Sequence, residues 1–285
     1  MRNKLVINDK SLRNYFVIAF LIPIAATVLV TLKDGLQTGL VTNQLSALAM
    51  VVVMSMVHAP TIAAMIVAYS DGGIMGIKDL FQQMKYWRFK SKWYLRALLI
   101  FPLSILASLL LISLFSQSFT PAWSLSFLAF ATLFSALWEE IGWTGYATPR
   151  MLKRISPLRT GISLGVIHTF WHLASDFWGS STFYGNLYLY AIHFLLWMVG
   201  LTVLRILILW IYIRTKSLVL GWLTHFSYTG GQLLLVPLTL SAVETLFWNS
   251  AFVFVSLLVM ALLVTMNKDF RDYWKSGFNG GSEVY

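Results

Sequence analysis

Eight stretches of mostly apolar residues follow one another along the chain, and each is close to the 20 or so residues that a helix needs to cross a bilayer. The predicted spans are residues 14–32, 46–69, 94–115, 122–147, 160–178, 186–210, 217–236 and 243–266. The chain is 58% hydrophobic and only 11% charged, far from the composition of a soluble globular domain. We therefore expect an all-α fold: a polytopic membrane protein with about eight transmembrane helices, forming a single domain over residues 1–285.

The basic residues indicate the orientation of these spans, because cytoplasmic loops of membrane proteins are rich in Lys and Arg. With eight spans, all of the 21 basic residues except Lys33 fall on one side of the membrane. In this count Arg205 belongs to the group around the exit of span six. Both termini are therefore predicted to be cytoplasmic, and the lack of an organelle or retention signal favours a bacterial plasma membrane.

The formal net charge of +10 has the lipid bilayer as its expected partner and not nucleic acid. The basic residues form short clusters between apolar runs and do not build a recognisable nucleic-acid-binding module. Residues 76–93, between spans two and three, alternate apolar and basic positions at helical spacing. We expect an interfacial helix there, on the cytoplasmic surface of the membrane, where its basic side contacts anionic lipid.

Two adjacent carboxylates are the first candidates for chemistry. Only Glu139 and Glu140, of eleven acidic residues, lie clearly inside a predicted span, where an acidic residue is costly and usually functional. Neighbouring helix positions point about 100° apart, so one carboxylate should face a reaction centre and the other a supporting partner. The alternative is that both lie near the cytoplasmic end of span four and extend into water.

Histidines repeat this pattern in two later spans. His168 and His172 are four residues apart on one face of span five, and His225 lies within span seven. The chain has no cysteine, so hydrolytic chemistry must come from carboxylates, imidazoles or hydroxyls. Glu and His are common parts of water activation and of metal sites, which predicts one site where spans four, five and seven meet. The alternative for each histidine is a hydrogen-bonded core residue, and we expect this for His58 and His193.

At these residues the chain resembles the CAAX prenyl protease and bacteriocin-processing (Abi, CPBP) family of intramembrane proteases. EEIGWTGY resembles the family motif Glu-Glu-x-x-x-Arg, HTFWHLA resembles Phe-x-x-x-His, and HFSYT resembles His-x-x-x-Asn. The resemblance covers most of the chain, with a motif-bearing core of about residues 94–236. It departs from the family pattern at Thr144, where the motif has Arg, at His168, where it has Phe, and at Thr229, where it has Asn.

The resemblance implies a helical fold with a cavity that opens to the cytoplasm and into the bilayer. By the same resemblance, Glu139 would take a proton from water near the cytoplasmic mouth, and His172 would help to bind that water. His225 and Thr229 would stabilise the oxyanion formed on the attacked peptide carbonyl. The implied catalytic residues are therefore Glu139, Glu140, His172, His225 and Thr229.

The departures change what is expected of the site. Thr144 cannot pair with Glu140 as an arginine would, so Glu140 must be protonated, hydrated, or paired with a more distant base such as Arg150 or Arg154. Exchanging an oxyanion donor from the amide of Asn to the hydroxyl of Thr229 should reduce the rate.

A cofactor is either not required or is a divalent metal ion, zinc being the natural choice for these side chains. The possible metal ligands are His168, His172, His225 and Glu139. The alternative for His168 is a hydrogen-bonded residue that lines the cavity, and we expect no tightly held ion.

Two functions are in competition. The first is an intramembrane endopeptidase that hydrolyses a peptide bond in a peptide or membrane-associated protein with glutamate-activated water. The second is a catalytically impaired family member, a membrane scaffold or bacteriocin-immunity protein that binds a partner such as a cell-wall enzyme. A transporter is disfavoured because the polar residues gather at one site and do not form a path across the membrane.

Overall fold

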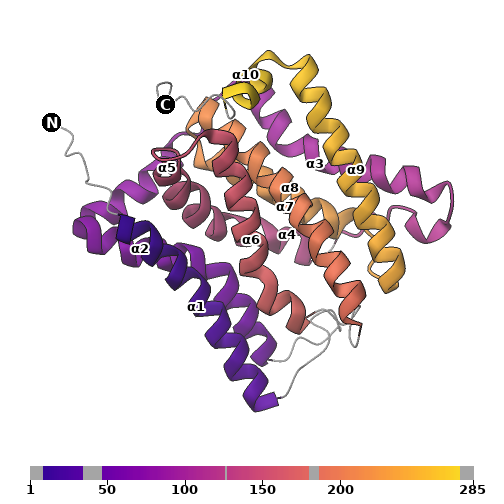
Figure 1. The fold of residues 1–285 in the computed structure, drawn as a ribbon, viewed down its shortest axis with the longest axis horizontal. Helices are drawn as coiled ribbons and strands as arrows, with labels where there is room; N and C mark the ends of the chain where they lie inside the picture. Colours follow the sequence, from indigo (N-terminus) through magenta and orange to yellow (C-terminus); the bar gives the residue numbers. More distant parts are fainter. Residues whose placement is uncertain (1–8, 35–46, 126, 180–185, 277–285) are drawn as a thin grey trace.

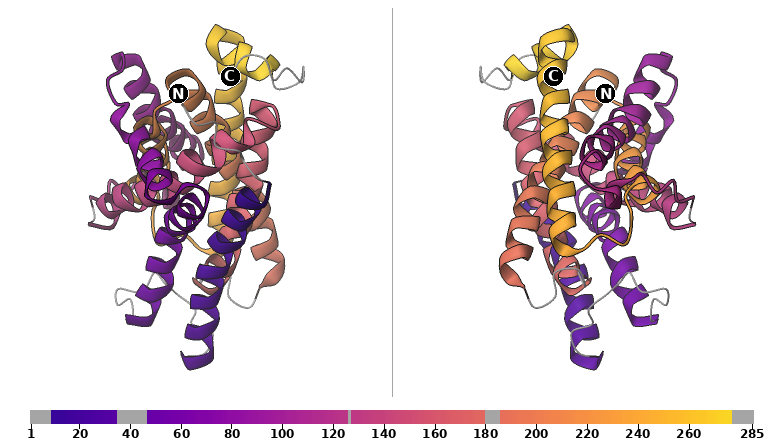
Figure 2. Two further views of the ribbon diagram at one scale, coloured as in Figure 1. Left: turned by 90° about the vertical axis from the view of Figure 1, so that its left-hand side faces the viewer. Right: turned by 90° about the vertical axis from the view of Figure 1, so that its right-hand side faces the viewer.

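The computed structural model describes residues 9–34, 47–125, 127–179 and 186–276, and in these ranges it is helical and has no strand (Figure 1). Long helices lie side by side in a bundle (Figure 2). The predicted all-α class is confirmed. The α-helices are α1 (Asp9–Asp34), α2 (Ala47–Gln82), α3 (Ser91–Ser113), α4 (Phe127–Glu140), α5 (Thr148–Met151), α6 (Pro157–Gly179), α7 (Leu187–Thr215), α8 (Leu218–Leu235), α9 (Ala242–Met266) and α10 (Lys268–Ser276). Two 3-10 turns, η1 (Gln83–Lys85) and η2 (Gln117–Phe119), and a π-helix, η3 (Ile141–Ala147), complete the described elements.

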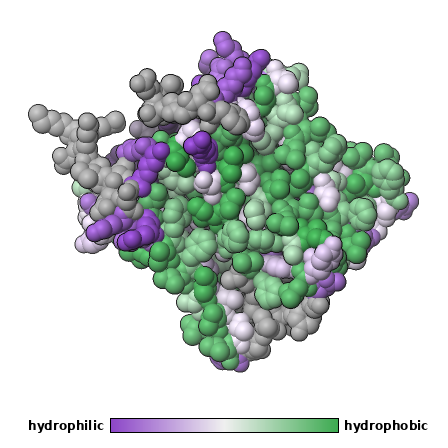
Figure 3. All heavy atoms as spheres, viewed as in Figure 1, coloured by the Kyte–Doolittle hydropathy of each residue, from purple (hydrophilic) through white to green (hydrophobic). Residues whose placement is uncertain are grey.

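Five of the described helices, α1, α2, α3, α7 and α9, are long and apolar enough to cross a membrane. The other three predicted spans correspond to α4 with η3 and α5, to α6, and to α8. These segments carry the candidate glutamates and histidines, whose polar side chains lower the mean hydropathy, and α4 has only 14 residues before the π-helix begins. Hydrophobic residues cover most of the face in Figure 3, and hydrophilic ones gather over α10 and at the left-hand edge, as expected for a membrane protein.

Helix α2 bends sharply before it ends. The backbone leaves the helical conformation at Gly72 and Gly73, and Gly73 has a φ of 57°, in the region that favours glycine. The short helical part after the bend runs through Gln82 and η1, and residues 86–90 then have no regular structure. The predicted interfacial helix over 76–93 is therefore too long: helical structure stops at Lys85 and resumes only where α3 begins.

Small residues let α6 and α7 approach closely. A side chain at Gly165 would overlap Thr202, and a Cβ at Gly161 would come within 3.1 Å of Ile206. These paired positions run in opposite directions along the two helices, so α6 and α7 are antiparallel neighbours. Glycine at such positions is typical of helix pairs inside membranes. The second half of α7 is buried along its length, which places it at the centre of the bundle.

The π-helix η3 lies between α2 and the rest of the bundle, and all seven of its residues are buried. A side chain at Gly142 would overlap the backbone of Pro60 on α2. The rings of Trp143 and Tyr146 pack against Tyr15 of α1, with centroids 5.9 and 4.9 Å away. The first two helices therefore form a wall that holds the segment after the two glutamates in place.

The amphipathic helix α10 was not predicted from the sequence. Phe270 of α10 is buried and meets Trp210 of α7 edge-on, with ring centroids 4.9 Å apart. The hydroxyl of Tyr273 donates to the carbonyl of Ile206 at 3.3 Å. This short helix covers the end of α7 that follows the candidate site.

Candidate active site

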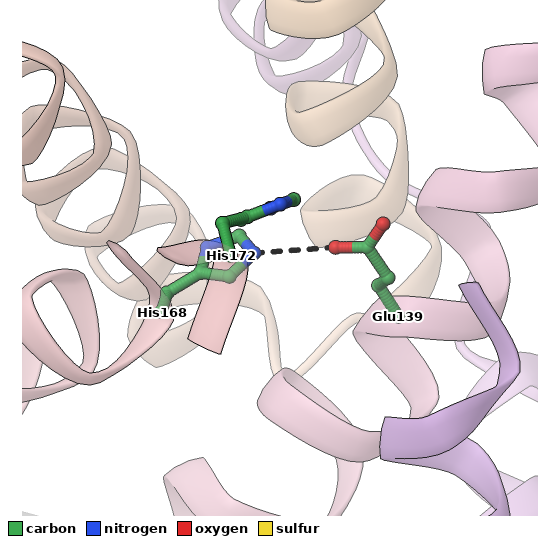
Figure 4. Close-up of side chains that lie close together, drawn as sticks. All are labelled: Glu139, His168 and His172. Carbon is green, nitrogen blue, oxygen red and sulfur yellow. Dashed lines mark hydrogen bonds and ion pairs between the residues drawn. The ribbon is translucent and has the colours of Figure 1, made fainter. Parts of the chain in front are cut away.

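Glu139, the penultimate residue of α4, faces two histidines of α6 (Figure 4). Its Oε2 atom lies 3.2 Å from Nε2 of His168. Candidate ligand atoms of Glu139, His168 and His172 all lie within 4.8 Å of one another. From α8, Nε2 of His225 comes to 4.0 Å from the same carboxylate oxygen. Helices α4, α6 and α8 thus bring the acid and the three motif-region histidines to one place.

Glu140, the next residue, faces a different environment and is fully buried. Its Oε1 atom forms an ion pair with Nη1 of Arg205 at 2.8 Å and accepts a hydrogen bond from Nδ1 of His225, also at 2.8 Å. The hydroxyl of Thr144 donates to Oε2, so both oxygens of Glu140 are engaged. The two adjacent carboxylates therefore differ as expected: Glu139 faces the histidines of α6, and Glu140 is held by surrounding donors.

The expectation that Glu140 pairs with Arg150 or Arg154 is wrong, because its cationic partner is Arg205. Arg150 instead donates to the carbonyl of Tyr146 at 3.1 Å and lies 4.0 Å from the carboxylate of Asp71. The same helix position of the motif, Thr144, still contributes a hydrogen bond to Glu140, but no charge.

Arg205 was assigned from the sequence to a cytoplasmic cluster, and this is also wrong. The residue is only 2% exposed and lies inside α7, which continues to Thr215. Its Nε and Nη2 atoms each lie 3.1 Å from Nδ1 of His168. Arg205 therefore contacts both halves of the site. The signal that could have found it is a lone arginine within a long apolar run, which is costly unless paired.

A pocket of about 230 Å³ lies beside Glu139. His172 and Asp176 of α6 also line it, and His172 is half-buried, with its ring against Trp171 and Trp197 at 4.7 and 5.0 Å between centroids. The remaining lining residues are Trp197 of α7 and four apolar residues of α2, namely Val52, Val53, Met56 and Val57. The site therefore combines a carboxylate and an imidazole with an apolar wall.

This pocket is built from the first half of α2, the last part of α6 and the first half of α7. In the orientation predicted from the charges, those parts lie in the non-cytoplasmic half of the bundle. Glu139 itself lies near the middle of the helical stretch 127–151 and not near its cytoplasmic end. The pocket beside Glu139 thus differs from the cytoplasmic mouth that was expected.

A second polar cluster adjoins the pocket. Nε2 of His193 lies 3.7 Å from Oδ2 of Asp176, and Nδ2 of Asn249 lies 2.9 Å from Nδ1 of His193. His193 was expected to be an isolated packing residue, and the structure instead gives it two polar partners. The signal for Asp176 was its place four residues after His172, on the same face of α6. His58 does behave as expected, since its Nδ1 bonds to the carbonyl of Met54 at 2.8 Å.

Thr229 is half-buried and lies one helical turn after His225 on α8. The helical period places both residues on the same face. Thr229 is thus close enough along the helix to act together with His225, and its role is taken up below.

Residues 121–230 match the family model of the type II CAAX prenyl endopeptidase Rce1-like proteins. The match contains every motif residue described above. Through these motifs, the chain belongs to the CAAX prenyl protease family. A curated member of this family, CAAX prenyl protease 2 of Methanococcus maripaludis, is 30% identical over 125 residues. That alignment covers 42% of this chain and 43% of the relative, so less than half of the relative's length is matched.

Proposed function

We propose that the protein is an intramembrane endopeptidase of the CAAX type, in which Glu139 activates water for the hydrolysis of a peptide bond. The observation that carries the proposal is the different treatment of two adjacent carboxylates. Glu140 is saturated by Arg205, His225 and Thr144, whereas Glu139 lies at a pocket beside two imidazoles. A general base needs this kind of access to water and to substrate.

The proposed reaction begins with a water molecule held between Glu139 and His172. Glu139 takes one proton as the water oxygen attacks the peptide carbonyl carbon, which forms a tetrahedral oxyanion. In its protonated form, His225 keeps its Nδ1–H on Glu140 and offers its Nε2–H to that oxyanion, and the hydroxyl of Thr229 supplies a second donor. The C–N bond then breaks, and the proton on Glu139 passes to the leaving nitrogen to give a carboxylic acid and an amine.

The proposed substrate is a peptide or the end of a membrane-associated protein. The four apolar side chains of α2 that line the pocket suit an apolar residue next to the scissile bond. The proposed location is a bacterial plasma membrane, with both termini in the cytoplasm.

A cleavage assay tests this proposal directly. Purified protein in lipid nanodiscs is mixed with a library of fluorogenic peptides, and wild type is compared with Glu139→Gln. The substitution keeps the shape of the side chain and removes the base, so turnover should fall by at least about 10²-fold. Glu244→Gln, at the exposed start of α9, is the matched control and should retain full activity. Cleavage by Glu139→Gln at the wild-type rate would refute the role of Glu139.

The second candidate is a membrane scaffold that has lost catalysis and binds a partner protein, such as a cell-wall enzyme, or confers immunity to a bacteriocin. Thr144 and Thr229 favour it, since both replace accessory groups of the family motif. Complementation of a deletion strain separates the two functions. Full complementation by Glu139→Gln at normal protein levels supports the scaffold, and its failure with folded, membrane-inserted protein supports the protease.

A further inference from the structure

We propose that Arg205 is a positioning residue with two tasks: it supplies from α7 the positive charge that Thr144 lacks, and it fixes His168 as a hydrogen-bond donor to Glu139. The second task makes His168 unfit as a metal ligand. The part of this proposal that concerns turnover rests on the proposed protease function, and the parts that concern hydrogen positions and metal binding do not.

The first task follows from burial and distance. Arg205 is 2% exposed and Glu140 is fully buried, and their charged groups lie 2.8 Å apart. A buried carboxylate needs a paired charge and further hydrogen bonds to remain ionised in such surroundings. Arg205 gives Glu140 the charge, and Thr144 gives it a hydrogen bond. The cation has thus moved in space from the glutamate helix to a neighbouring one.

The geometry of α6 and α7 explains how Arg205 reaches this position. Gly165 lets α7 come close to α6 at Thr202, three residues before Arg205. Side chains on a helix tilt toward its N-terminus, so the side chain of Arg205 points back toward the level of His168. Its guanidinium group also lies 5.8 Å from the ring centroid of Trp143, the tryptophan of the EEIGW motif.

The second task follows from the chemistry of the two side chains. A guanidinium group carries donors only and does not lose its proton in proteins. Because Nε and Nη2 of Arg205 both lie 3.1 Å from Nδ1 of His168, that nitrogen must be an acceptor without a hydrogen. The ring hydrogen of His168 is then on Nε2, 3.2 Å from Oε2 of Glu139, and the bond runs from the histidine to the carboxylate.

This tautomer conflicts with a metal site at His168. Ligation through Nε2 needs the lone pair of that nitrogen, so the hydrogen would have to move to Nδ1, where it would face the N–H groups of Arg205. The distances within the cluster of Glu139, His168 and His172 suit a divalent ion, but the hydrogen positions set by Arg205 do not. His225 is held the other way round, because its Nδ1 donates to the carboxylate of Glu140.

Histidine ¹⁵N NMR tests the tautomer without any assay of activity. The protein is labelled at its five histidines, and His168→Gln assigns the signal. We expect the neutral Nε2–H form of His168 in wild type. In Glu140→Gln/Arg205→Met, which removes both charges together and so avoids a lone buried carboxylate, the signal should shift toward a mixture of the two tautomers. An Nδ1–H form or an imidazolium in wild type would overturn the proposal.

Cobalt binding tests the consequence for metals. Co²⁺ alone is titrated into wild type and into Glu140→Gln/Arg205→Met, and its visible absorption is followed. The double variant frees Nδ1 of His168 and should bind Co²⁺ more tightly by about 10-fold or more. Tight binding by wild type that is lost in His168→Gln would show that Arg205 does not block ligation.

Moving the charge tests the first task. Arg205→Met should lower kcat, and Thr144→Arg/Arg205→Met should recover part of the loss, because arginine at 144 is four residues from Glu140 on the same helix face. Arg205→Lys is the matched control, since a single ammonium group keeps the charge but cannot contact Glu140 and His168 together. We expect Arg205→Lys to retain the fold and lose the fixed tautomer. A wild-type NMR spectrum for Arg205→Lys would contradict this assignment.

Discussion

Replacing Glu140 by glutamine and Arg205 by methionine, singly and together, measures the coupling between the two buried charges. Each single change leaves one charge without its partner at a position that is no more than 2% exposed. Such a loss typically costs about 3–5 kcal/mol of the free energy of unfolding. The double variant removes both charges, so its loss should be smaller than the sum of the single losses, with a coupling energy of about 2–3 kcal/mol.

The pair formed by Arg150 and Asp71 is the matched control. Its charged atoms are 4.0 Å apart, and its side chains are 16% and 23% exposed. Solvent screens such a pair, so the cycle of Arg150→Met and Asp71→Asn should give a coupling energy below about 1 kcal/mol.

Unfolding can be followed by tryptophan fluorescence during titration with SDS in mixed micelles, since the chain has 12 tryptophans. Both cycles are measured under the same conditions. Additive effects of Glu140→Gln and Arg205→Met, within about 0.5 kcal/mol, would refute the reasoning that these two charges stabilise each other.

Three further predictions concern the backbone, the rate and the orientation. Gly142→Ala should destabilise the protein by about 1–3 kcal/mol because the new Cβ would overlap the backbone of α2, whereas Gly145→Ala, whose Cβ would have its nearest neighbour at 3.5 Å, should be tolerated; equal unfolding midpoints would contradict this. Thr229→Asn should raise turnover in the peptide assay, by up to about 10²-fold if a full oxyanion donor is regained, and unchanged kcat would exclude that role. A cysteine at Ser156 should react with an impermeant reagent in inside-out vesicles only, and one at Leu238 in intact cells only; the reverse pattern would invert the predicted topology.

The helices could be predicted from the sequence because their apolar runs are long and separated by charged or turn residues. The ends are less certain where backbone hydrogen bonds compete. Span four was expected from residue 122, but the amide of Ala122 donates to the carbonyl of Leu235, and α4 begins only at Phe127. The bend of α2 at Gly73 also lies inside a helix whose apolar pattern had already ended at 69.

The acidic and imidazole groups of the site could be found because each interrupts an apolar run at a position that is costly to fill. Arg205 does the same, yet it was read as a loop charge because span six was expected to end at 210. The structure extends α7 to Thr215, and those extra residues place Arg205 well inside the helix. Counting loop charges depends on where each span ends, whereas the pairing of a buried charge depends on which helices are neighbours. The second kind of information is not present in the chain's linear pattern.

The π-helix that follows the two glutamates has a consequence for comparing relatives. Each hydrogen bond of a π-helix spans five residues and not four, so η3 accommodates a residue that an α-helix of the same length would not. Deleting one residue within η3 would let the segment close as an α-helix and would rotate the glutamates by about 100° against everything that follows. A homologue with one residue fewer between its glutamate pair and the loop before α6 must therefore aim its carboxylates differently, and an alignment gap in this segment marks a change in the direction of the active-site acid.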